Sequence, residues 1–282
     1  MILIADGGST KADWILLDKE GEQVFKTRTG GLNPAVFSED LMKARLNDNE
    51  DLYSVKEQVT NVYFYGAGCG TQPPKDLLSK VLRSIFINSE FDIKEDTYAA
   101  VYSCCKPNEN AIVSILGTGS NCSYFDGNKL NQKVTSLGYV LMDDASGNYF
   151  GRQLLRDYYF NRFPPDLEKK FKSEFDLQAE VIKDSLYKKP NPNTYLAKFA
   201  KFLVENKNLE YSKQLIRKGF NLFIENQIEQ FENHKNVNLH FVGSIGYYLK
   251  EELREALYQK QLKIGKVLRR PIEGLVAFHQ SN

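Results

Sequence analysis

Residues 1–18, MILIADGGSTKADWILLD, decide the fold, because two apolar runs enclose one short polar segment. The runs are ILIA at residues 2–5 and WILL at residues 14–17, and DGGSTK lies between them at residues 6–11. Apolar runs joined by a glycine-rich turn are typical of a buried β-hairpin. Glycine lacks a Cβ atom, so the backbone of such a turn can approach another group closely. The stretch therefore predicts a hairpin whose turn faces a ligand.

The polar segment carries groups that bind phosphate. Its hydroxyls and its ammonium group can all donate hydrogen bonds to phosphate oxygens. Asp6 ends the first apolar run, and a carboxylate beside a phosphate is a usual ligand of Mg²⁺, directly or through water. A plain Gly-Gly hairpin without a ligand is the alternative for this stretch taken alone. The residues of the expected phosphate turn are Gly7, Gly8, Ser9, Thr10 and Lys11.

Length and charge limit the classes of partner. A chain of 282 residues exceeds the usual size of one hydrophobic core, so we expect two domains with a cleft between them. Lys and Arg number 37 against 36 Asp and Glu, and a net charge of +1 gives no reason to expect nucleic acid or an acidic membrane surface. Neither a membrane-spanning run nor a secretion signal is apparent, so we expect a cytoplasmic protein that binds a small molecule.

The cysteines and histidines do not have metal-ligand spacing. The four cysteines lack CxxC spacing and leave more than half of the chain uncovered, which argues against a disulfide framework or a structural zinc site. We expect reduced, buried thiols and histidines that are structural or exposed. The residues are Cys69, Cys104, Cys105, Cys122, His234, His240 and His279.

Two polar residues in the first half of the chain are candidates for a site. Asn33 lies in GGLNP at residues 30–34, a loop in which the residue before proline is held extended. Asp96 lies near the start of a helix expected over residues 98–105. The local alternatives are a turn asparagine and a helix-capping acid. Between them, a strand over residues 60–65 leads into another glycine-rich loop, as at a ligand-binding sheet edge.

A second copy of the opening unit begins near residue 110. NAIVSIL at residues 110–116 predicts a buried strand, GTGSN follows at residues 117–121, and a hairpin over residues 122–134 completes the unit. Each copy therefore consists of a strand, a small-residue turn and two further strands. We expect the two turns, with Thr10 and Thr118, to bind successive phosphates of one nucleotide from opposite sides of the cleft.

Later segments supply fewer candidates. MDDAS at residues 142–146 precedes a helix expected over residues 149–163, and acids at such a helix entry commonly cap it or bind a ligand. A strand over residues 239–242 enters Gly243-Ser244, which fits an adenosine resting on a helix N-terminus. The lysine-rich, helical residues 164–232 contain no recognisable catalytic pattern.

These motifs in this order resemble the acetate and sugar kinase, heat-shock chaperone and actin superfamily. Within it they are similar to the N-acetylglucosamine kinase branch of the BadF/BadG/BcrA/BcrD-type ATPase family. DGGSTK matches the first phosphate motif of the family, GTGSN the second, and VGS at residues 242–244 the adenosine motif. Neither GxxxxGK[ST] nor GxGxxG occurs, so nucleotide-binding folds of the Walker and Rossmann types have no motif here.

The resemblance implies an α/β fold with two ribonuclease H-like, actin-like ATPase domains, whose mixed five-stranded sheets flank a nucleotide cleft. The domains would span residues 1–108 and 109–270, and residues 271–282 would form a C-terminal helix that returns to the first domain. The implied reaction is ATP-dependent phosphorylation of a neutral amino sugar, N-acetylglucosamine at O6, in carbohydrate metabolism. A homodimer is left open.

The resemblance also implies roles for individual residues. Asp96 would accept the proton of the attacking sugar hydroxyl, and Asp6 would bind Mg²⁺. The residues implied to bind ATP are Gly7, Gly8, Ser9, Thr10, Lys11, Gly117, Thr118, Gly119, Ser120, Gly243 and Ser244. Those implied to bind the sugar are Asn33, Thr118, Gly119, Asn121, Asp143 and Gly147.

The chain departs from the family pattern near Asp143, which leaves the exact sugar open. It reads MDDAS where the family has GDEGS, and Leu137 replaces an aromatic residue. The segments expected to bind the sugar, residues 30–34, 94–98 and 137–147, contain one base, Lys94, which disfavours an acidic sugar.

Two other functions stay open at this point. An ATPase activator of a dehydratase would need thiolate ligands for an iron–sulfur cluster after the second phosphate motif, and no cysteine follows Cys122. A non-catalytic nucleotide-dependent sensor would be expected to have lost the catalytic acid, and Asp96 is present.

Overall fold

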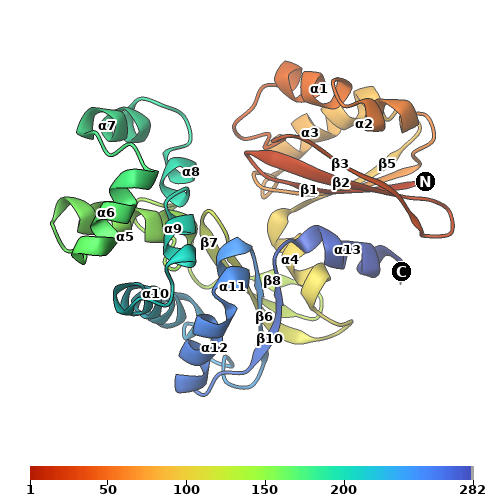
Figure 1. The fold of residues 1–282 in the computed structure, drawn as a ribbon. Coiled ribbons are helices and arrows are strands. Elements are labelled where there is room, and N and C mark those ends of the chain that lie inside the picture. Colours follow the sequence, from red (N-terminus) through yellow and green to blue (C-terminus); the bar gives the residue numbers. More distant parts are fainter. Residues whose placement is uncertain (281–282) are drawn as a thin grey trace. The chain divides into compact units, whose positions relative to one another are not determined.

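The computed structural model describes residues 1–280 and divides the chain into two units. Unit 1 comprises Met1–Lys106 together with the segment from Arg270 onward, and unit 2 comprises Pro107–Arg269. Each unit contains one five-stranded mixed sheet with helices packed against it (Figure 1). The expectation of an α/β fold with two mixed five-stranded sheets is therefore confirmed. Residues 281–282, the end of the expected C-terminal helix, lie outside the described residues.

The sheet of unit 1 has the strand order β3-β2-β1-β4-β5. The central strand β1 pairs antiparallel with β2, with Ile4 opposite Ile15, and parallel with β4, with Ile4 opposite Tyr63. The hairpin predicted from residues 1–18 is thus present. The strands are β1 (Ile2–Gly7), β2 (Lys11–Leu17), β3 (Gln23–Gly30), β4 (Asn61–Gly66) and β5 (Glu90–Glu95).

Helices cover both faces of this sheet. On one face a core that includes Trp14 and Phe64 packs against α1, α2 and α3. On the other face Ile4 and Ile15 pack against α4 and α13, and in α13 the contacts are made by Ile272 and Leu275. The helices are α1 (Glu39–Asn47), α2 (Glu50–Val55), α3 (Gln72–Ile85), α4 (Asp96–Cys104) and α13 (Pro271–Gln280).

The contact between α4 and α13 depends on small side chains. A Cβ atom on Gly274 would lie 2.6 Å from both Cβ and the carbonyl oxygen of Ser103, so the two helices approach closely at this point. Tyr65, from β4, donates or accepts a hydrogen bond with Nε2 of His279 at 3.0 Å, which adds a polar contact between the sheet and α13. The last helix is therefore a packed part of unit 1.

The sheet of unit 2 repeats this arrangement, with the order β10-β9-β6-β7-β8. Its central strand β6 pairs antiparallel with β7 and parallel with β9, as β1 does with β2 and β4. The second strand of the hairpin expected over residues 122–134 is only two residues long. The strands are β6 (Asn110–Leu116), β7 (Ser120–Asp126), β8 (Leu130–Asn131), β9 (Asn238–Val242) and β10 (Ile264–Leu268).

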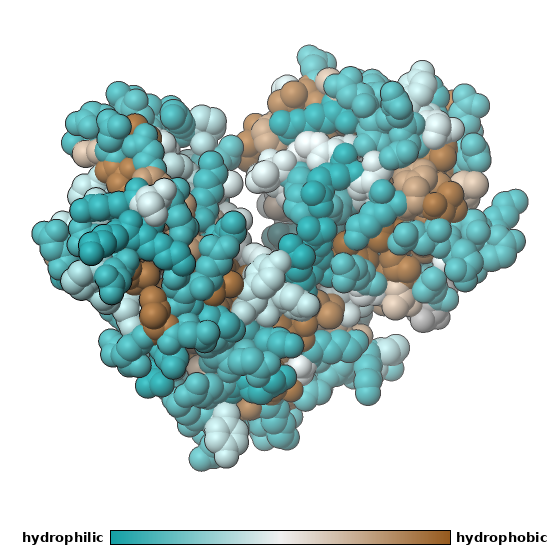
Figure 2. Space-filling view, viewed as in Figure 1, coloured by the Kyte–Doolittle hydropathy of each residue, from teal (hydrophilic) through white to brown (hydrophobic). Residues whose placement is uncertain are grey.

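The remaining helices of unit 2 enclose an aromatic-rich core that includes Phe150, Phe171 and Phe220. Most of the face drawn in Figure 2 is teal, as expected when the apolar residues of the helices are buried. None of the helices within residues 1–280 combines the length and the apolar character needed to cross a membrane. The helices are α5 (Gly147–Tyr159), α6 (Pro165–Glu174), α7 (Ala179–Tyr187), α8 (Pro192–Ala197), α9 (Ala200–Glu205), α10 (Glu210–Phe223), the π-helix η1 (Ile224–Ile228), α11 (Ser244–Tyr248) and α12 (Lys250–Gln259).

Two strands were not apparent from the sequence pattern. β5 and β10 lie at the sheet edges, and charged residues interrupt both: they alternate with apolar residues in β5, and Lys266 lies in the middle of β10. Charged side chains are common on edge strands because they oppose edge-to-edge association. Two helices follow Gly243: the short α11 begins directly after it, and α12 follows α11.

The packing of α13 leads to a stability prediction. Leu275 is fully buried against the sheet, so we expect Leu275→Ala to lower the free energy of unfolding by about 2–5 kcal/mol. Urea unfolding followed by the fluorescence of Trp14 measures this in unit 1, because Trp14 is the single tryptophan of the chain and is buried there. Val24→Ala, at a side chain that is 50% exposed, is the control and should change little. Equal losses in both variants would contradict the packing described.

Candidate functional site

The turn between β1 and β2 is held by backbone hydrogen bonds to a second loop. Gly8 N donates to Lys11 O at 2.8 Å and closes the turn. Gly31 N donates to Thr10 O at 3.1 Å, and Leu32 N donates to Gly8 O at 3.2 Å, so residues 31–32 support the turn from one side. The predicted phosphate turn therefore has a defined conformation.

Asn33 joins this turn through its side chain. Its Nδ2 donates to Ser9 Oγ at 2.8 Å, and its Oδ1 accepts from Ala35 N at 2.9 Å. Gly68 lies so close that a Cβ atom there would be 2.0 Å from Asn33 Oδ1. The residue expected to bind sugar and a residue expected to bind ATP are thus in direct contact, and the loop after β4 lies against both.

The two predicted acids of unit 1 both have raised pKa values. Burial, and after it the negative charge of Asp96, raise the pKa of Asp6 to about 7. Burial likewise raises the pKa of Asp96 to about 6, followed by the charge of Glu95, whereas hydrogen bonds from backbone N–H groups at the start of α4 lower it. Mg²⁺ prefers oxygen ligands, and a cation would relieve this repulsion, so the donor set fits a magnesium ion.

Lys11 has a partner within the protein. Its Nζ lies 3.0 Å from Oδ2 of Asp13, which also accepts a hydrogen bond at Oδ1 from Arg28 Nε at 2.7 Å. Burial raises the pKa of Asp13, but the hydrogen bonds from Lys11 and Arg28 outweigh it and hold the pKa below its usual value. In this structure the ammonium group is therefore directed to β2, and a phosphate ligand would have to compete with Asp13 for it.

The turn between β6 and β7 is fastened to the start of α5. Gly147 N donates to Gly117 O at 2.8 Å, and Asn148 N donates to Thr118 O at 2.9 Å. Ser146 caps the helix, since its Oγ accepts from Tyr149 N at 3.2 Å. The expected phosphate turn of unit 2 and the N-terminus of a 13-residue helix consequently form one backbone network.

Asp143 lies beside this turn. Its φ of 67° is in the left-handed region, which is uncommon for a residue with a side chain. A Cβ atom on Gly119 would be 2.7 Å from Asp143 Oδ2, so the carboxylate approaches the turn closely. The neighbouring acid, Asp144, is directed elsewhere and accepts from Asn226 Nδ2 of η1 at 2.9 Å. Of the two adjacent acids, only Asp143 contacts the turn.

The sequence interpretation missed Asn148. Its Nδ2 donates both to Asp143 Oδ2 and to Thr118 O, each at 2.7 Å. Its Oδ1 is buried and has no hydrogen-bond partner within residues 1–280. A buried acceptor left in that state costs about 1–3 kcal/mol. The only sequence signal was a polar residue just inside a helix start, a position that usually indicates capping.

The other predicted site residues of unit 2 have different surroundings. Asn121 Oδ1 accepts from Ser123 Oγ and from Gln132 Nε2, both at 3.3 Å. Gly243 has a φ of 124°, and a Cβ atom there would lie 2.3 Å from Leu116 O, so only glycine fits. Ser244 is exposed at the first position of α11, and Ser120 opens β7.

Two glycines of the turns are not required by the fold. A Cβ atom on Gly8 would make only an ordinary contact, 3.5 Å from Lys11 O, and one on Gly117 would meet no atom within 4 Å. By contrast, a Cβ atom on Gly31 would lie 2.2 Å from Ser9 O. Each turn therefore has one glycine beside open space, where a ligand could approach the backbone.

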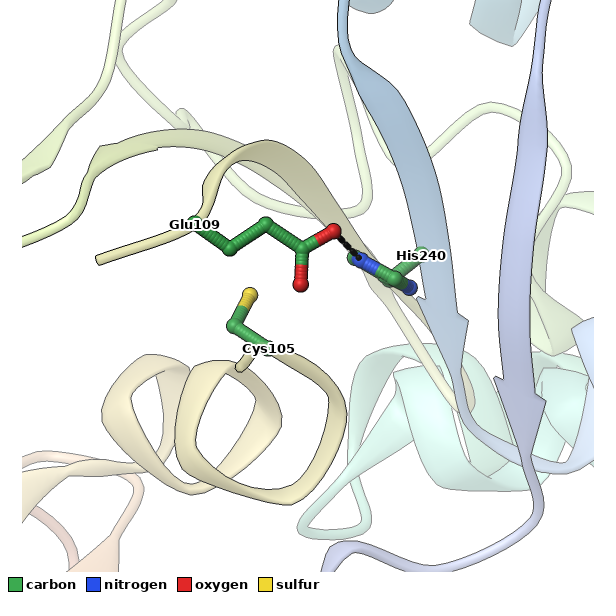
Figure 3. A group of neighbouring side chains, drawn as sticks. All are labelled: Cys105, Glu109 and His240. Carbon is green, nitrogen blue, oxygen red and sulfur yellow. Dashed lines mark hydrogen bonds and ion pairs between the residues drawn. The ribbon is translucent and has the colours of Figure 1, made fainter. Parts of the chain in front are cut away.

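His240, which is not among the predicted site residues, is buried and hydrogen-bonded to Glu109. Figure 3 shows Glu109 and His240 of unit 2 joined at 3.2 Å between Oε1 and Nε2, with Cys105, which belongs to unit 1, also drawn. Lys266 N donates to Nδ1 of His240 at 2.8 Å, so the ring proton lies on Nε2 and is donated to Glu109. Burial lowers the pKa of His240, consistent with a neutral ring. Both nitrogens are engaged within the sheet, as expected for a structural histidine.

Comparison with solved structures finds a full-length match at more than 30% identity. The chain is 32% identical to a putative N-acetylglucosamine kinase from Porphyromonas gingivalis, with a TM-score of 0.93 and coverage of 100% of this chain and 99% of that one. A second structure with that description, from Chromobacterium violaceum, has 13% identity, a TM-score of 0.68 and 98% coverage of both chains.

A more distant structure is a ROK family glucokinase from Streptomyces griseus in complex with glucose and AMPPNP, with 15% identity, a TM-score of 0.59 and coverage of 98% and 97%. At this identity, as with the Chromobacterium protein, the similarity concerns the fold alone. No protein-family model and no curated protein sequence matches the chain.

A glycine that the fold requires, Gly31, and a glycine beside open space, Gly8, give a paired test. Gly31→Ala should lower the melting temperature, because its Cβ atom would collide with the carbonyl of Ser9. Gly8→Ala should leave the melting temperature near that of the wild type but weaken Mg-ATP binding, because the new methyl group fills the space expected for a phosphate. Thermal unfolding and titration calorimetry measure the two effects. Unchanged ATP affinity in Gly8→Ala would remove the turn from the nucleotide site.

Proposed function

This chain belongs to the sugar kinase superfamily, and from that membership we propose that it transfers the terminal phosphate of ATP to the 6-hydroxyl of N-acetylglucosamine. The relationship to the Porphyromonas protein extends over the full length of both chains at 32% identity, which supports an amino sugar as the acceptor. The motifs at residues 6–11, 117–121 and 242–244 support a finer placement, in the N-acetylglucosamine kinase branch of the BadF/BadG/BcrA/BcrD-type ATPases.

The observation that carries the proposal is the glycine beside open space in each turn. Gly8 and Gly117 could both accept a Cβ atom without disturbing the fold, so their lack of a side chain is best explained by a ligand that approaches the backbone. Hydroxyls follow in both turns, from Ser9 and Thr10 and from Thr118 and Ser120. We propose that these groups bind the phosphates of ATP, together with Gly7, Lys11 and Gly119, and that Gly243 and Ser244 contact the adenosine.

Catalysis then depends on position and charge. Asp96 would accept the proton of the sugar hydroxyl as it attacks, while Asn33, Asn121, Asp143 and Gly147 would orient the ring. Asp6 would hold Mg²⁺, which supplies charge neutralisation for the transferred phosphate. The raised pKa of Asp96, which results mainly from burial, makes it a better proton acceptor than an ordinary aspartate.

The charges near the expected acceptor site support a neutral sugar. Lys94 is the one base in the segments expected to bind the sugar, and it forms an ion pair with Asp92. An acidic sugar would therefore find no unpaired base in those segments. Carboxylates and amides suit the hydroxyls of a neutral ring, and an uncharged N-acetyl group needs no counter-ion.

The state of Cys122 weighs against the alternative role as a dehydratase activator. Burial raises the pKa of Cys122 to about 12, and its sulfur accepts a hydrogen bond from Ser114 Oγ at 3.4 Å. Cysteine ligands of an iron–sulfur cluster held between two subunits must reach the surface, whereas Cys122 is 3% exposed. A phosphoryl-transfer reaction uses no such group.

Asp96 gives the first functional test. Asp96→Asn should lower kcat by about 10²–10⁴-fold, the usual contribution of a general base, and should leave ATP affinity nearly unchanged. Asp51, also an acid in the first turn of a helix, is the matched control, and Asp51→Asn should keep wild-type kcat. A coupled assay of ADP release measures both. If Asp96→Asn retained wild-type turnover, Asp96 would be only a residue of the helix start.

The substrate gives the second test. N-acetylglucosamine should have a higher kcat/KM than glucosamine, glucose or N-acetylmuramic acid, because the site offers neutral and acidic groups without an unpaired base. The same coupled assay compares the sugars, and phosphorus NMR identifies the phosphorylated hydroxyl. A higher kcat/KM for N-acetylmuramic acid would refute the neutral acceptor, and phosphorylation at O1 would refute the assignment to O6, while either result would leave a sugar kinase.

A further inference from the structure

We propose that Asn148 is a positioning residue that holds the carboxylate of Asp143 and the carbonyl group of Thr118 in one geometry. The inference rests on the proposed function, in which Asp143 orients the sugar and Thr118 lies in the phosphate turn. Through these two contacts within unit 2, Asn148 would fix the position of the sugar relative to that of the phosphate.

The orientation of the amide is determined by its partners. Nδ2 lies 2.7 Å from Asp143 Oδ2 and 2.7 Å from Thr118 O, and both of these atoms only accept hydrogen bonds. Reversing the amide would place its oxygen against two acceptors, which is unfavourable. A single NH₂ group therefore links two segments that are 25 residues apart in the chain, and both of its hydrogens are used.

The backbone of Asn148 strengthens the link. Its N–H donates to Thr118 O at 2.9 Å, so the same carbonyl receives two hydrogen bonds from one residue. Asn148 is 1% exposed and lies in the first turn of α5, which is packed in the core of unit 2. The donor is thus attached to a rigid element, as a positioning group requires.

Asp143 needs such a restraint. Its backbone is in the left-handed region, and the residue is only 8% exposed. Because Asn148 holds Oδ2, the direction in which Oδ1 can accept a hydrogen bond from a sugar hydroxyl is also determined. Without the amide, the side chain of Asp143 could rotate about χ2 and lose that direction.

The unpaired oxygen of Asn148 argues against a purely structural role. Its Oδ1 is buried without a partner in the part of the chain that the structure describes. The fold would avoid this cost with an apolar residue at position 148. Retaining an asparagine at such a position is understandable if its NH₂ group is needed for Asp143 and Thr118.

The experiment compares Asn148→Ala with a matched buried amide. Asn206 is the control, because its Nδ2 also donates to a buried carbonyl, Phe202 O at 2.7 Å, and its Oδ1 accepts from Lys170, which is not a proposed site residue. We expect Asn148→Ala to lower kcat/KM for N-acetylglucosamine by about 10- to 100-fold, the range for a lost hydrogen bond to a charged group, mainly through KM for the sugar. Asn206→Ala should lower the melting temperature and leave KM for the sugar unchanged.

A double-variant cycle tests whether Asn148 acts through Asp143. In an Asp143→Asn background, Asn148→Ala should cause less than a threefold further loss, because the carboxylate that it positions is already removed. Full additivity of the two losses would overturn the proposal. A wild-type KM for the sugar in Asn148→Ala alone would also overturn it.

Hydrogen exchange tests the inference separately from the proposed function. Asn148→Ala should increase amide exchange in peptides that cover residues 117–121 and 143–147 and leave β9 and α10 unchanged. If the wild-type chain phosphorylated no amino sugar, the proposed function would fail, and this pattern would still support the positioning role. Unchanged exchange in both segments would overturn the role of Asn148 whatever the kinase assay shows.

Discussion

The parallel pairing of the central strand in each sheet is the constraint on which both candidate sites depend. β1 pairs with β4, so the backbone after β4 meets the first turn, where Ala67 N donates to Gly7 O at 2.9 Å. β6 pairs with β9, so Gly243 lies against Leu116 O. Parallel strands end at the same edge of a sheet, and this brings segments far apart in the sequence to each turn. The functional groups of each unit are gathered there for that reason.

Neutral amides make the side-chain links at both edges. In unit 1, Asn33 donates to Ser9, and in unit 2, Asn148 donates to Asp143 and Thr118. An amide can donate and accept hydrogen bonds without adding a charge, so it fixes a turn without changing the local electrostatic balance. This matters where the charge of Asp96 already raises the pKa of Asp6 and where ATP is proposed to bind.

The glycines at these edges serve two different physical requirements. Gly31 and Gly243 are needed because another backbone atom occupies the space of a Cβ atom, and Gly243 also has a positive φ. Gly8 and Gly117 meet no such obstacle. A glycine is therefore required by internal packing at some positions and leaves the backbone open to a ligand at others. Only the tertiary structure distinguishes the two kinds of position, because the sequence shows a glycine at both.

The sequence by itself determined the hairpins, the repeated strand–turn–strand unit and helices such as α5, expected over residues 149–163, because apolar periodicity and capping act between near neighbours. It also identified both turns, Asn33, Asp96 and Asp143 as candidates, whose roles stay proposals. Only the tertiary structure decided that β5 and β10 are strands, that Lys11 pairs with Asp13, and that Asn148 joins Asp143 to Thr118. Those outcomes depend on which strand lies at an edge and which side chains meet, and such long-range contacts leave no local pattern.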